Sequence, residues 1–352
     1  MRRDFAEFLA LTAQDRRDVF ETAAGRLDTL ASYVEKDFWV CVVLDALFNG
    51  RPSDQPRVLF KGGTSLSKGF GLIQRFSEDI DVVVSREDLG FGQGRDPTRV
   101  EGLSNKARRG LFEDLRSSCS EYICGGLADC LGSILGESCR IVQDADDEGQ
   151  QTLLIEYPSL FSTSETDYVQ PRVKLECGAR SALEPTVVVS VVAYIEEEIP
   201  DLISGVGGIH MIVPERTFLE KLLILHGVYC GYRDESRLPA DRHRISRHYY
   251  DVAMMSETEV GMNAVVDTGL LEDVRCHNLV AFRQAWKRFE EAVPGTIGVV
   301  PQNELGRAVE RDYRAMRDMI LGEVPEFAWI MGRLKRLDAL VNGKRKSTPV
   351  TG

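Results

Sequence analysis

"FKGGTSLSKGFGLIQRFSEDIDVVV", residues 60–84, is the stretch from which the fold of this 352-residue chain can be worked out. It passes from a short apolar segment through Gly62 and Gly63 into a short helical pattern, and it ends in an apolar strand. Paired glycines between a strand and a helix let the backbone come close to an anion, and the start of the helix offers unpaired N–H groups. Thr64 and Ser65 add hydroxyl donors. The pattern predicts a phosphate-binding turn; the alternative is a tight strand-to-helix turn with capping residues only.

A lysine follows the glycines, but the order of residues is not that of a Walker P-loop. That motif needs Gly-Lys-Ser or Gly-Lys-Thr, whereas here Ser67 precedes Lys68 and Gly69 follows it. The sequence therefore excludes a P-loop. The candidate nucleotide-binding residues of the stretch are Gly62, Gly63, Thr64, Ser65 and Lys68.

Two aspartates open the apolar strand that ends the stretch. Asp79 and Asp81 are two residues apart, so in a strand both carboxylates project from one face while Ile80 faces the other. Such a pair repels itself and lowers strand propensity unless a cation holds it. Oxygen ligands at this spacing suit Mg²⁺, which is commonly bound by one or two carboxylates together with substrate phosphates. The alternative is a charged edge strand that resists aggregation.

The composition is that of an ordinary globular protein, with 43% hydrophobic and 28% charged residues. No apolar run approaches the roughly 20 residues needed to span a bilayer, and charges interrupt the N-terminal segment, unlike a signal peptide. The eight cysteines form no CxxC pair, which fits a reducing compartment. We therefore expect a cytoplasmic protein without membrane association.

The formal net charge of −12 argues against a protein that coats nucleic acids nonspecifically. One segment, residues 233–248, nevertheless concentrates basic side chains. It is either a surface that an RNA could approach or a solvated loop. The basic residues of this segment are Arg233, Arg237, Arg242, His243, Arg244, Arg247 and His248.

The order of hydrophobic patterns predicts an α+β fold with two domains. A helical lead-in precedes a small mixed sheet, and the chain is almost wholly helical after about residue 212. The domains are expected at 1–212, a core with N-terminal helices, and 213–352, a helical domain. Residues 85–99 are glycine-rich and polar and are expected to form a mobile surface loop. Strands are expected within residues 57–60, 80–84, 151–159, 172–179 and 186–195.

Several motifs in a fixed order resemble a known family. "GGTSL", a spacer and "EDIDVVV" are similar to the signature of polymerase-β-like nucleotidyltransferases. Together with "VEKDFWV", "RTFLEKLLIL" and "RHYYDVA", they resemble the AbiEii-like nucleotidyltransferase toxins of type IV toxin–antitoxin and phage-defence systems. The resemblance spans roughly residues 33–255.

The resemblance implies roles for particular residues. It assigns Gly63 and Ser65 to phosphate contact, and Asp79 and Asp81 to metal binding. Further along the chain it gives Lys221 the nucleotide phosphates and Asp251 a catalytic or positioning role, while Glu176 is a candidate third metal ligand. The alternatives are that Lys221 extends to solvent from an apolar helix, and that Asp251 or Glu176 pairs with an arginine.

The resemblance also implies an activity: transfer of a nucleotide from an NTP, with Mg²⁺, to an acceptor hydroxyl. The implied acceptor is the 3′ end of a tRNA, and the implied outcome is growth inhibition. An antitoxin is an expected partner, although a direct complex is not assumed. One alternative keeps the chemistry on a small-molecule or protein hydroxyl. The other is a non-catalytic nucleotide-binding protein.

Overall fold

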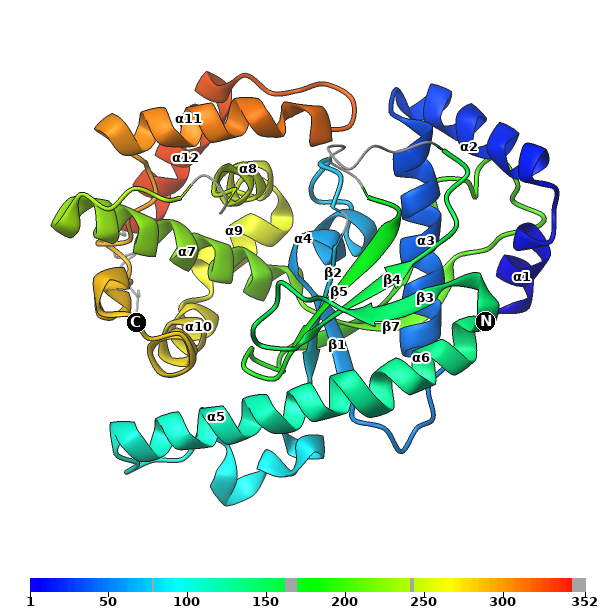
Figure 1. The fold of residues 1–352 in the computed structure, drawn as a ribbon. Helices are drawn as coiled ribbons and strands as arrows, with labels where there is room; N and C mark the ends of the chain where they lie inside the picture. Colours follow the sequence, from blue (N-terminus) through cyan, green and yellow to red (C-terminus); the bar gives the residue numbers. More distant parts are fainter. Residues whose placement is uncertain (78, 162–169, 241–243, 344–352) are drawn as a thin grey trace, which may run out of the picture. The chain divides into compact units, whose positions relative to one another are not determined.

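A computed structural model describes residues 1–77, 79–161, 170–240 and 244–343. The chain divides into two compact units, Met1–Val213 and Pro214–Gly352, called the N-terminal and C-terminal units below. The N-terminal unit contains helices and a mixed sheet, and the C-terminal unit is helical in the parts described (Figure 1). The predicted α+β fold is therefore confirmed.

Three helices lead into the sheet: α1 (Arg3–Leu9), α2 (Ala13–Leu27) and α3 (Ala31–Phe48). The sequence sets the start of α2, because the Thr12 side chain accepts a hydrogen bond from the Asp15 N–H, 3.1 Å away. Every residue of α3 from 33 to 47 is buried, including its charged residues. A helix that is buried on all sides lies in a protein interior, and α3 packs against strands of the sheet.

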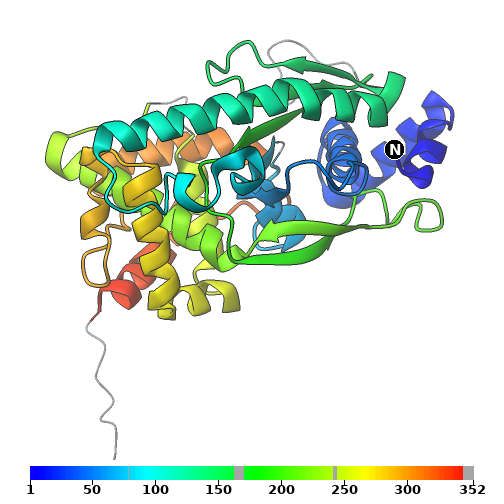
Figure 2. The same cartoon turned by 90° about the horizontal axis from the view of Figure 1, so that it is seen from below.

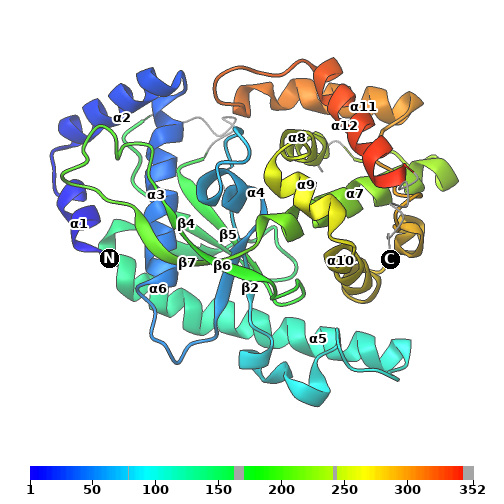
Figure 3. The same ribbon diagram turned by 180° about the vertical axis from the view of Figure 1, so that it is seen from behind.

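Seven strands form one sheet in the order β3-β4-β5-β2-β1-β7-β6 (Figures 1 and 3). The central pair β1 and β2 is antiparallel, whereas β1 with β7 and β2 with β5 are parallel. The two flanking parts, β3-β4-β5 and β7-β6, are antiparallel. The strands are β1 (Val58–Lys61), β2 (Asp79–Val84), β3 (Arg140–Gln143), β4 (Thr152–Glu156), β5 (Arg172–Gly178), β6 (Thr186–Val191) and β7 (Val206–Ile212).

The five predicted strands correspond to β1, β2, β4, β5 and β6, but β3 and β7 were not predicted. The sequence of β7, VGGIHMI, contains two glycines, and glycine is depleted in strands because it has no side chain to pack. In the fold, β7 is nevertheless an interior strand of the sheet, because it pairs with both β1 and β6. The β3 strand has only four residues and lies at the sheet edge.

Residues 85–99, expected as a surface loop, form two short helical segments, Glu87–Phe91 and Gln93–Arg95. This segment is anchored by a buried ion pair, in which the Arg86 Nε lies 3.0 Å from an Asp96 carboxylate oxygen. A nearly continuous helical run follows, formed by α5 (Asn105–Tyr122), a short π-helical link and α6 (Ala128–Leu135) (Figure 2).

The C-terminal unit is built from six α-helices and short 3₁₀ segments in its described residues. Its buried side chains are mainly apolar and come from all six helices. None of the helices in the described ranges is both long enough and apolar enough to cross a bilayer. The helices are α7 (Pro214–Glu235), α8 (Ser246–Met255), α9 (Glu259–Val266), α10 (Thr268–Ala281), α11 (Asn303–Met316) and α12 (Phe327–Asn342).

Candidate functional site

The first glycine of the turn lies directly against an aspartate of the β2 strand. Gly62 follows the last residue of β1 and has a φ of +80°, a conformation that other L-residues adopt only with strain. A Cβ atom at this position would lie 2.2 Å from the Asp81 Oδ2. Gly62 is therefore required for two reasons, its backbone conformation and the close approach of the Asp81 carboxylate.

The second glycine and the two hydroxyl residues hold the turn to the segment before β2. A Cβ atom on Gly63 would lie 2.4 Å from the Arg75 Nη2. The Thr64 hydroxyl lies 2.7 Å from the Ser77 Oγ and also contacts the carbonyl oxygen of Asp79. The Ser65 hydroxyl donates to the Gly62 carbonyl at 2.9 Å. Thr64 and Ser65 are buried and stabilise the turn; their contact with a phosphate stays a prediction.

The two predicted metal ligands share one face of β2. Asp79 and Asp81 are half-buried and flank Ile80, which is fully buried in the core. The parallel pairing with β5 places Lys174 beside Asp79 and Glu176 beside Asp81. The sheet register therefore gathers carboxylates and a lysine on this face.

Lys174 is the positively charged side chain that β5 places on this face. Its Nζ lies 3.0 Å from the Glu176 Oε1 and 3.5 Å from an Asp144 carboxylate oxygen. Partial burial lowers the pKa of Lys174, but the carboxylates of Glu176, Asp79 and Asp144 outweigh this effect and raise it above its usual value. The partner of Glu176 is thus a lysine rather than an arginine, and its role as a third metal ligand stays a prediction.

The residues of this face fit a divalent cation whose remaining ligands come from a substrate. Two carboxylates lie on one side of β2, and Gly62 leaves the space beside Asp81 free of a side chain. Within the described residues, no group of three His, Cys, Asp or Glu side chains is arranged to hold a metal ion. Mg²⁺ commonly takes only one or two protein carboxylates and fills its other positions with water and phosphate oxygens, so a two-carboxylate site suits it.

Lys68, a candidate nucleotide-binding residue, is buried in an ion pair. Its Nζ lies 2.6 Å from the Asp37 Oδ1, donates to the carbonyl oxygen of Val192 and lies 4.2 Å from the centre of the Tyr194 ring. Its side chain is only 5% exposed. Burial lowers the pKa of a lysine, but the Asp37 carboxylate outweighs burial and raises the pKa of Lys68 above its usual range. The structure gives Lys68 a structural contact, and its nucleotide contact stays a prediction.

Another lysine near the glycine turn, Lys61, was not among the predicted site residues. It ends β1 and is the direct partner of Asp81 in the antiparallel pair, so both side chains lie on one face of the sheet. It is half-buried, and within the described part of the chain its side chain makes no hydrogen bond or ion pair. Its position directly before the glycines was visible, but its placement opposite Asp81 depends on the strand register.

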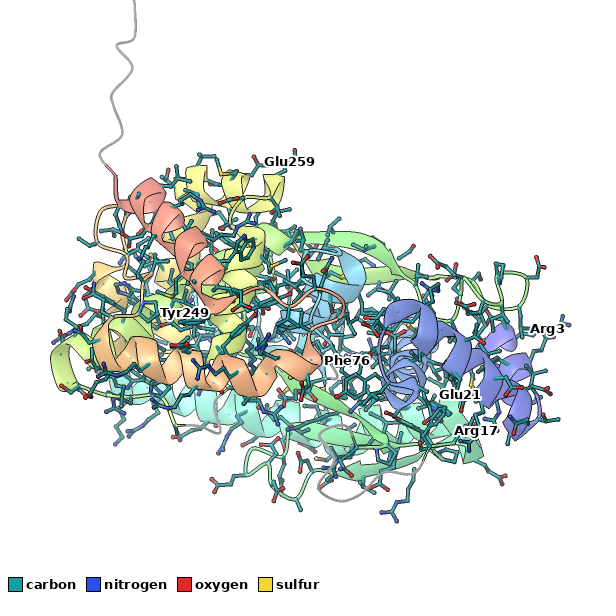
Figure 4. All side chains as sticks on the ribbon, turned by 90° about the horizontal axis from the view of Figure 1, so that it is seen from above. Arg3, Arg17, Glu21, Phe76, Tyr249 and Glu259 are labelled. Atoms are coloured by element: carbon teal, nitrogen blue, oxygen red, sulfur yellow. The ribbon has the colours of Figure 1, made fainter. Side chains whose placement is uncertain are left out.

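The remaining predicted residues form a pair inside the C-terminal unit. The Lys221 Nζ on α7 lies 2.9 Å from the Asp251 Oδ2 on α8, and their side chains are 8% and 0% exposed. The alternative that Lys221 extends to solvent is wrong, because its side chain is buried, and Asp251 has a lysine among its partners. Figure 4 labels Tyr249 on the same helix as Asp251; this residue is also buried.

The basic segment at 233–248 is partly neutralised. The Arg233 Nη1 lies 2.9 Å from a Glu291 oxygen, and the Arg237 Nη2 lies 3.0 Å from a Glu235 oxygen. Arg242 and His243 lie outside the described residues. The acidic partners make this surface less positive than its arginines alone would indicate.

One family of known proteins matches most of this chain. Residues 45–340 match the family model of the nucleotidyl transferase AbiEii toxin of type IV toxin–antitoxin systems. Among curated proteins, no match is found. A solved structure, the nucleotidyltransferase toxin MenT4 from Mycobacterium tuberculosis H37Rv, is 17% identical, with a TM-score of 0.46 over 95% of this chain and 90% of that chain. That likeness is too distant to support an argument, so the assignment depends on the family match. The resemblance seen in the sequence is confirmed: the chain belongs to the AbiEii family of nucleotidyltransferase toxins of type IV toxin–antitoxin systems.

Proposed function

We propose that this enzyme transfers a nucleotide from an NTP to the 3′-terminal hydroxyl of a tRNA and thereby inhibits growth. The observation that carries the proposal is the contact between Gly62 and Asp81, which joins a backbone turn and a carboxylate pair in one place. Phosphate groups need backbone N–H donors and positive charge, and a metal needs carboxylates. The glycine turn follows β1, and the carboxylate pair opens β2.

In this proposal Asp79 and Asp81 bind Mg²⁺, which would neutralise charge on the triphosphate. The glycine turn would hold the phosphates through its backbone, and Lys61 would add a positive charge on the same sheet face. The acceptor hydroxyl attacks the α-phosphorus, the bond from that phosphorus to the bridging oxygen breaks, and pyrophosphate leaves. The hydroxyl proton passes to a carboxylate or to water. Catalysis of this kind consists largely of positioning and charge neutralisation.

Lys221 and Asp251 are proposed to act in the same reaction, Lys221 on the phosphates and Asp251 in positioning Lys221. The support is that both lie in stretches that resemble the family motifs, within the matched range 45–340, and contact each other at 2.9 Å. Glu176 is proposed as a further ligand or as the residue that orients Lys174. An NTP and an antitoxin are the expected partners, and a role in phage defence is part of the proposal.

A second acceptor class is favoured by one observation, the acidic character of the chain. The net charge is −12, and Arg233 in the last turn of α7 and Arg237 just after it are paired with glutamates. An RNA ligand needs positive surface, whereas a small-molecule or protein hydroxyl does not. The alternative function is therefore the same transfer to a small molecule or to a protein.

Label transfer distinguishes the two acceptors. The protein is incubated at low salt with Mg²⁺, total RNA and each α-labelled NTP in turn, and parallel reactions use γ-labelled NTP. We expect α-label, but no γ-label, on RNA of tRNA size, and no transfer by the Asp81→Asn variant. Label that appears only on protein or on a small molecule would support the alternative. RNA labelled equally by Asp81→Asn would contradict the proposed site.

A further inference from the structure

A buried ion pair anchors the helical segment that continues the glycine turn. Lys68 belongs to the short helical segment that continues the turn, Ser65–Gly69, and Asp37 lies in the middle of α3. Their side chains are 5% and 3% exposed, and the Nζ–Oδ1 distance is 2.6 Å. The pair therefore ties the turn to a helix that is itself buried along its length.

Both members of this pair also make hydrogen bonds to other parts of the protein. Lys68 also donates to the Val192 carbonyl and lies over the ring of Tyr194. The second oxygen of Asp37 accepts from the Tyr194 N–H at 2.8 Å. Three parts of the N-terminal unit thus meet at one pair: α3, the segment after the turn, and the chain that follows β6. A lysine held in this way cannot reach for a phosphate without breaking the pair.

Burying two charges is costly, and an apolar pair of similar volume is often as stable. Stability alone therefore does not explain why this position holds an ion pair. What a charged, hydrogen-bonded pair adds is a fixed geometry, because its contacts are directional. The element fixed here is the segment that begins with Gly62 and Gly63.

A second contact ties the other side of the site to the same helix. The ring of Phe76 stacks on Tyr33 of α3, with ring centres 4.7 Å apart and an interplanar angle of 18° (Phe76 is labelled in Figure 4). Both rings are buried. The neighbours of Phe76 are the residues that contact the turn: Arg75 lies against Gly63, and Ser77 lies beside Thr64.

We propose that Asp37 and Lys68 are positioning residues of the nucleotide site, and that their ion pair holds the glycine turn in the conformation that receives the NTP phosphates. This inference rests on the proposed function of the turn. It assigns Lys68 an indirect role, in place of the phosphate contact expected from its position after the glycines. It also gives a role to Asp37, which lies in the "VEKDFWV" motif and has no role assigned to it there.

A double-mutant cycle tests the proposal. The variants are Lys68→Met, Asp37→Asn and both together, and the measurement is the Kd of a fluorescent NTP analogue with Mg²⁺. If the pair acts through the turn, each single change raises Kd by about tenfold or more, and the double variant is no weaker than the weaker single. If Lys68 instead contacts phosphate directly, Lys68→Met weakens binding while Asp37→Asn leaves Kd near that of the wild type. That second result would overturn the proposal.

A matched control separates positioning from loss of stability. Arg86 and Asp96 form another buried ion pair of the same unit, with side chains 4% and 9% exposed, beyond the opposite end of β2 from Asp79. Arg86→Met is expected to lower the melting temperature without changing Kd. An equal rise in Kd in Arg86→Met and Lys68→Met would show a general effect of destabilisation and would overturn the assignment.

If the single variants fail to fold, a double variant with two apolar residues is used instead. Asp37→Leu with Lys68→Met leaves no unpaired buried charge. A folded double variant with raised Kd supports the positioning role, and one with the Kd of the wild type overturns it. A wild-type protein that binds no NTP would contradict the proposed function and the inference with it. Equal binding by all variants would contradict the inference alone.

Discussion

Asp81 in the N-terminal unit and Asp251 in the C-terminal unit are both carboxylates of stretches that resemble the family motifs, but their surroundings differ. Asp81 is half-buried, its partner across the strand pair is Lys61, and its carboxylate lies against the backbone of Gly62. Asp251 is fully buried and lies 2.9 Å from Lys221. The first carboxylate is partly exposed, whereas the second is buried beside a lysine. Substitutions at the first should change activity, and substitutions at the second should change stability as well.

The largest expected effect comes from separating the buried pair. Lys221→Met removes the cation and leaves the Asp251 carboxylate in an interior that does not solvate it. Breaking a buried pair from one side costs about 3–5 kcal/mol, so we expect the free energy of unfolding to fall by that amount. Urea denaturation followed by circular dichroism measures it.

The control for this prediction removes both charges. Lys221→Met with Asp251→Leu should recover most of the lost stability, because both charges of the pair are removed together. Activity should be lost in both variants if the pair serves the reaction. A single variant as stable as the wild type would contradict the account of Asp251 as a carboxylate that depends on its partner.

The next largest effect is expected from Gly62→Ala, and it concerns the rate of nucleotide transfer. Gly62→Ala places a methyl group where the Asp81 Oδ2 now lies, 2.2 Å from the ideal Cβ position. The carboxylate must move by about an ångström, and a displacement of that size can cost about 100-fold in rate, or about 2.7 kcal/mol. Initial rates of label transfer measure the change.

Gly71 provides the matched control for Gly62→Ala. It also has a positive φ, +62°, but a Cβ atom there would meet nothing within 4 Å. Gly71→Ala should therefore cost only the strain of the left-handed backbone, about 1–2 kcal/mol of stability, with transfer rates near those of the wild type. Equal losses of activity in the two variants would show that backbone strain, rather than contact with Asp81, explains the requirement for Gly62.

The residues that could be predicted are those whose signal is local. The glycine turn and the aspartate pair lie within one stretch of 25 residues, and their spacing alone indicates a turn and one strand face. The partners of Lys68 and Asp81 could not be predicted in this way. Asp37 and Lys61 reach them through helix packing and strand register, which are properties of the whole fold. The β7 strand was missed for a similar reason, because pairing on both sides overcomes its glycines.

The smallest expected effect concerns His226, another group of the C-terminal unit whose polar atoms are satisfied internally. Its Nδ1 accepts from the Gly298 N–H at 3.0 Å, so the ring proton lies on Nε2, which donates to the Arg288 carbonyl at 3.0 Å. Only the neutral ring can make both bonds, and burial lowers the pKa of His226 below its usual 6.5. The unfolded chain therefore binds a proton at a higher pH than the folded protein does. Stability is full above about pH 6.5 and falls as the pH drops below that value.

Urea denaturation at pH 7.5 and 5.5 measures this dependence, and His226→Gln should reduce it, at the cost of lower stability at both pH values. The exposed His210, replaced by glutamine in the same way, is the control and should leave the difference between the two pH values unchanged. If His226→Gln kept the full pH dependence, the buried histidine would not be its source. In that case the stability of the C-terminal unit would depend on the buried Lys221–Asp251 pair but not on a neutral buried histidine.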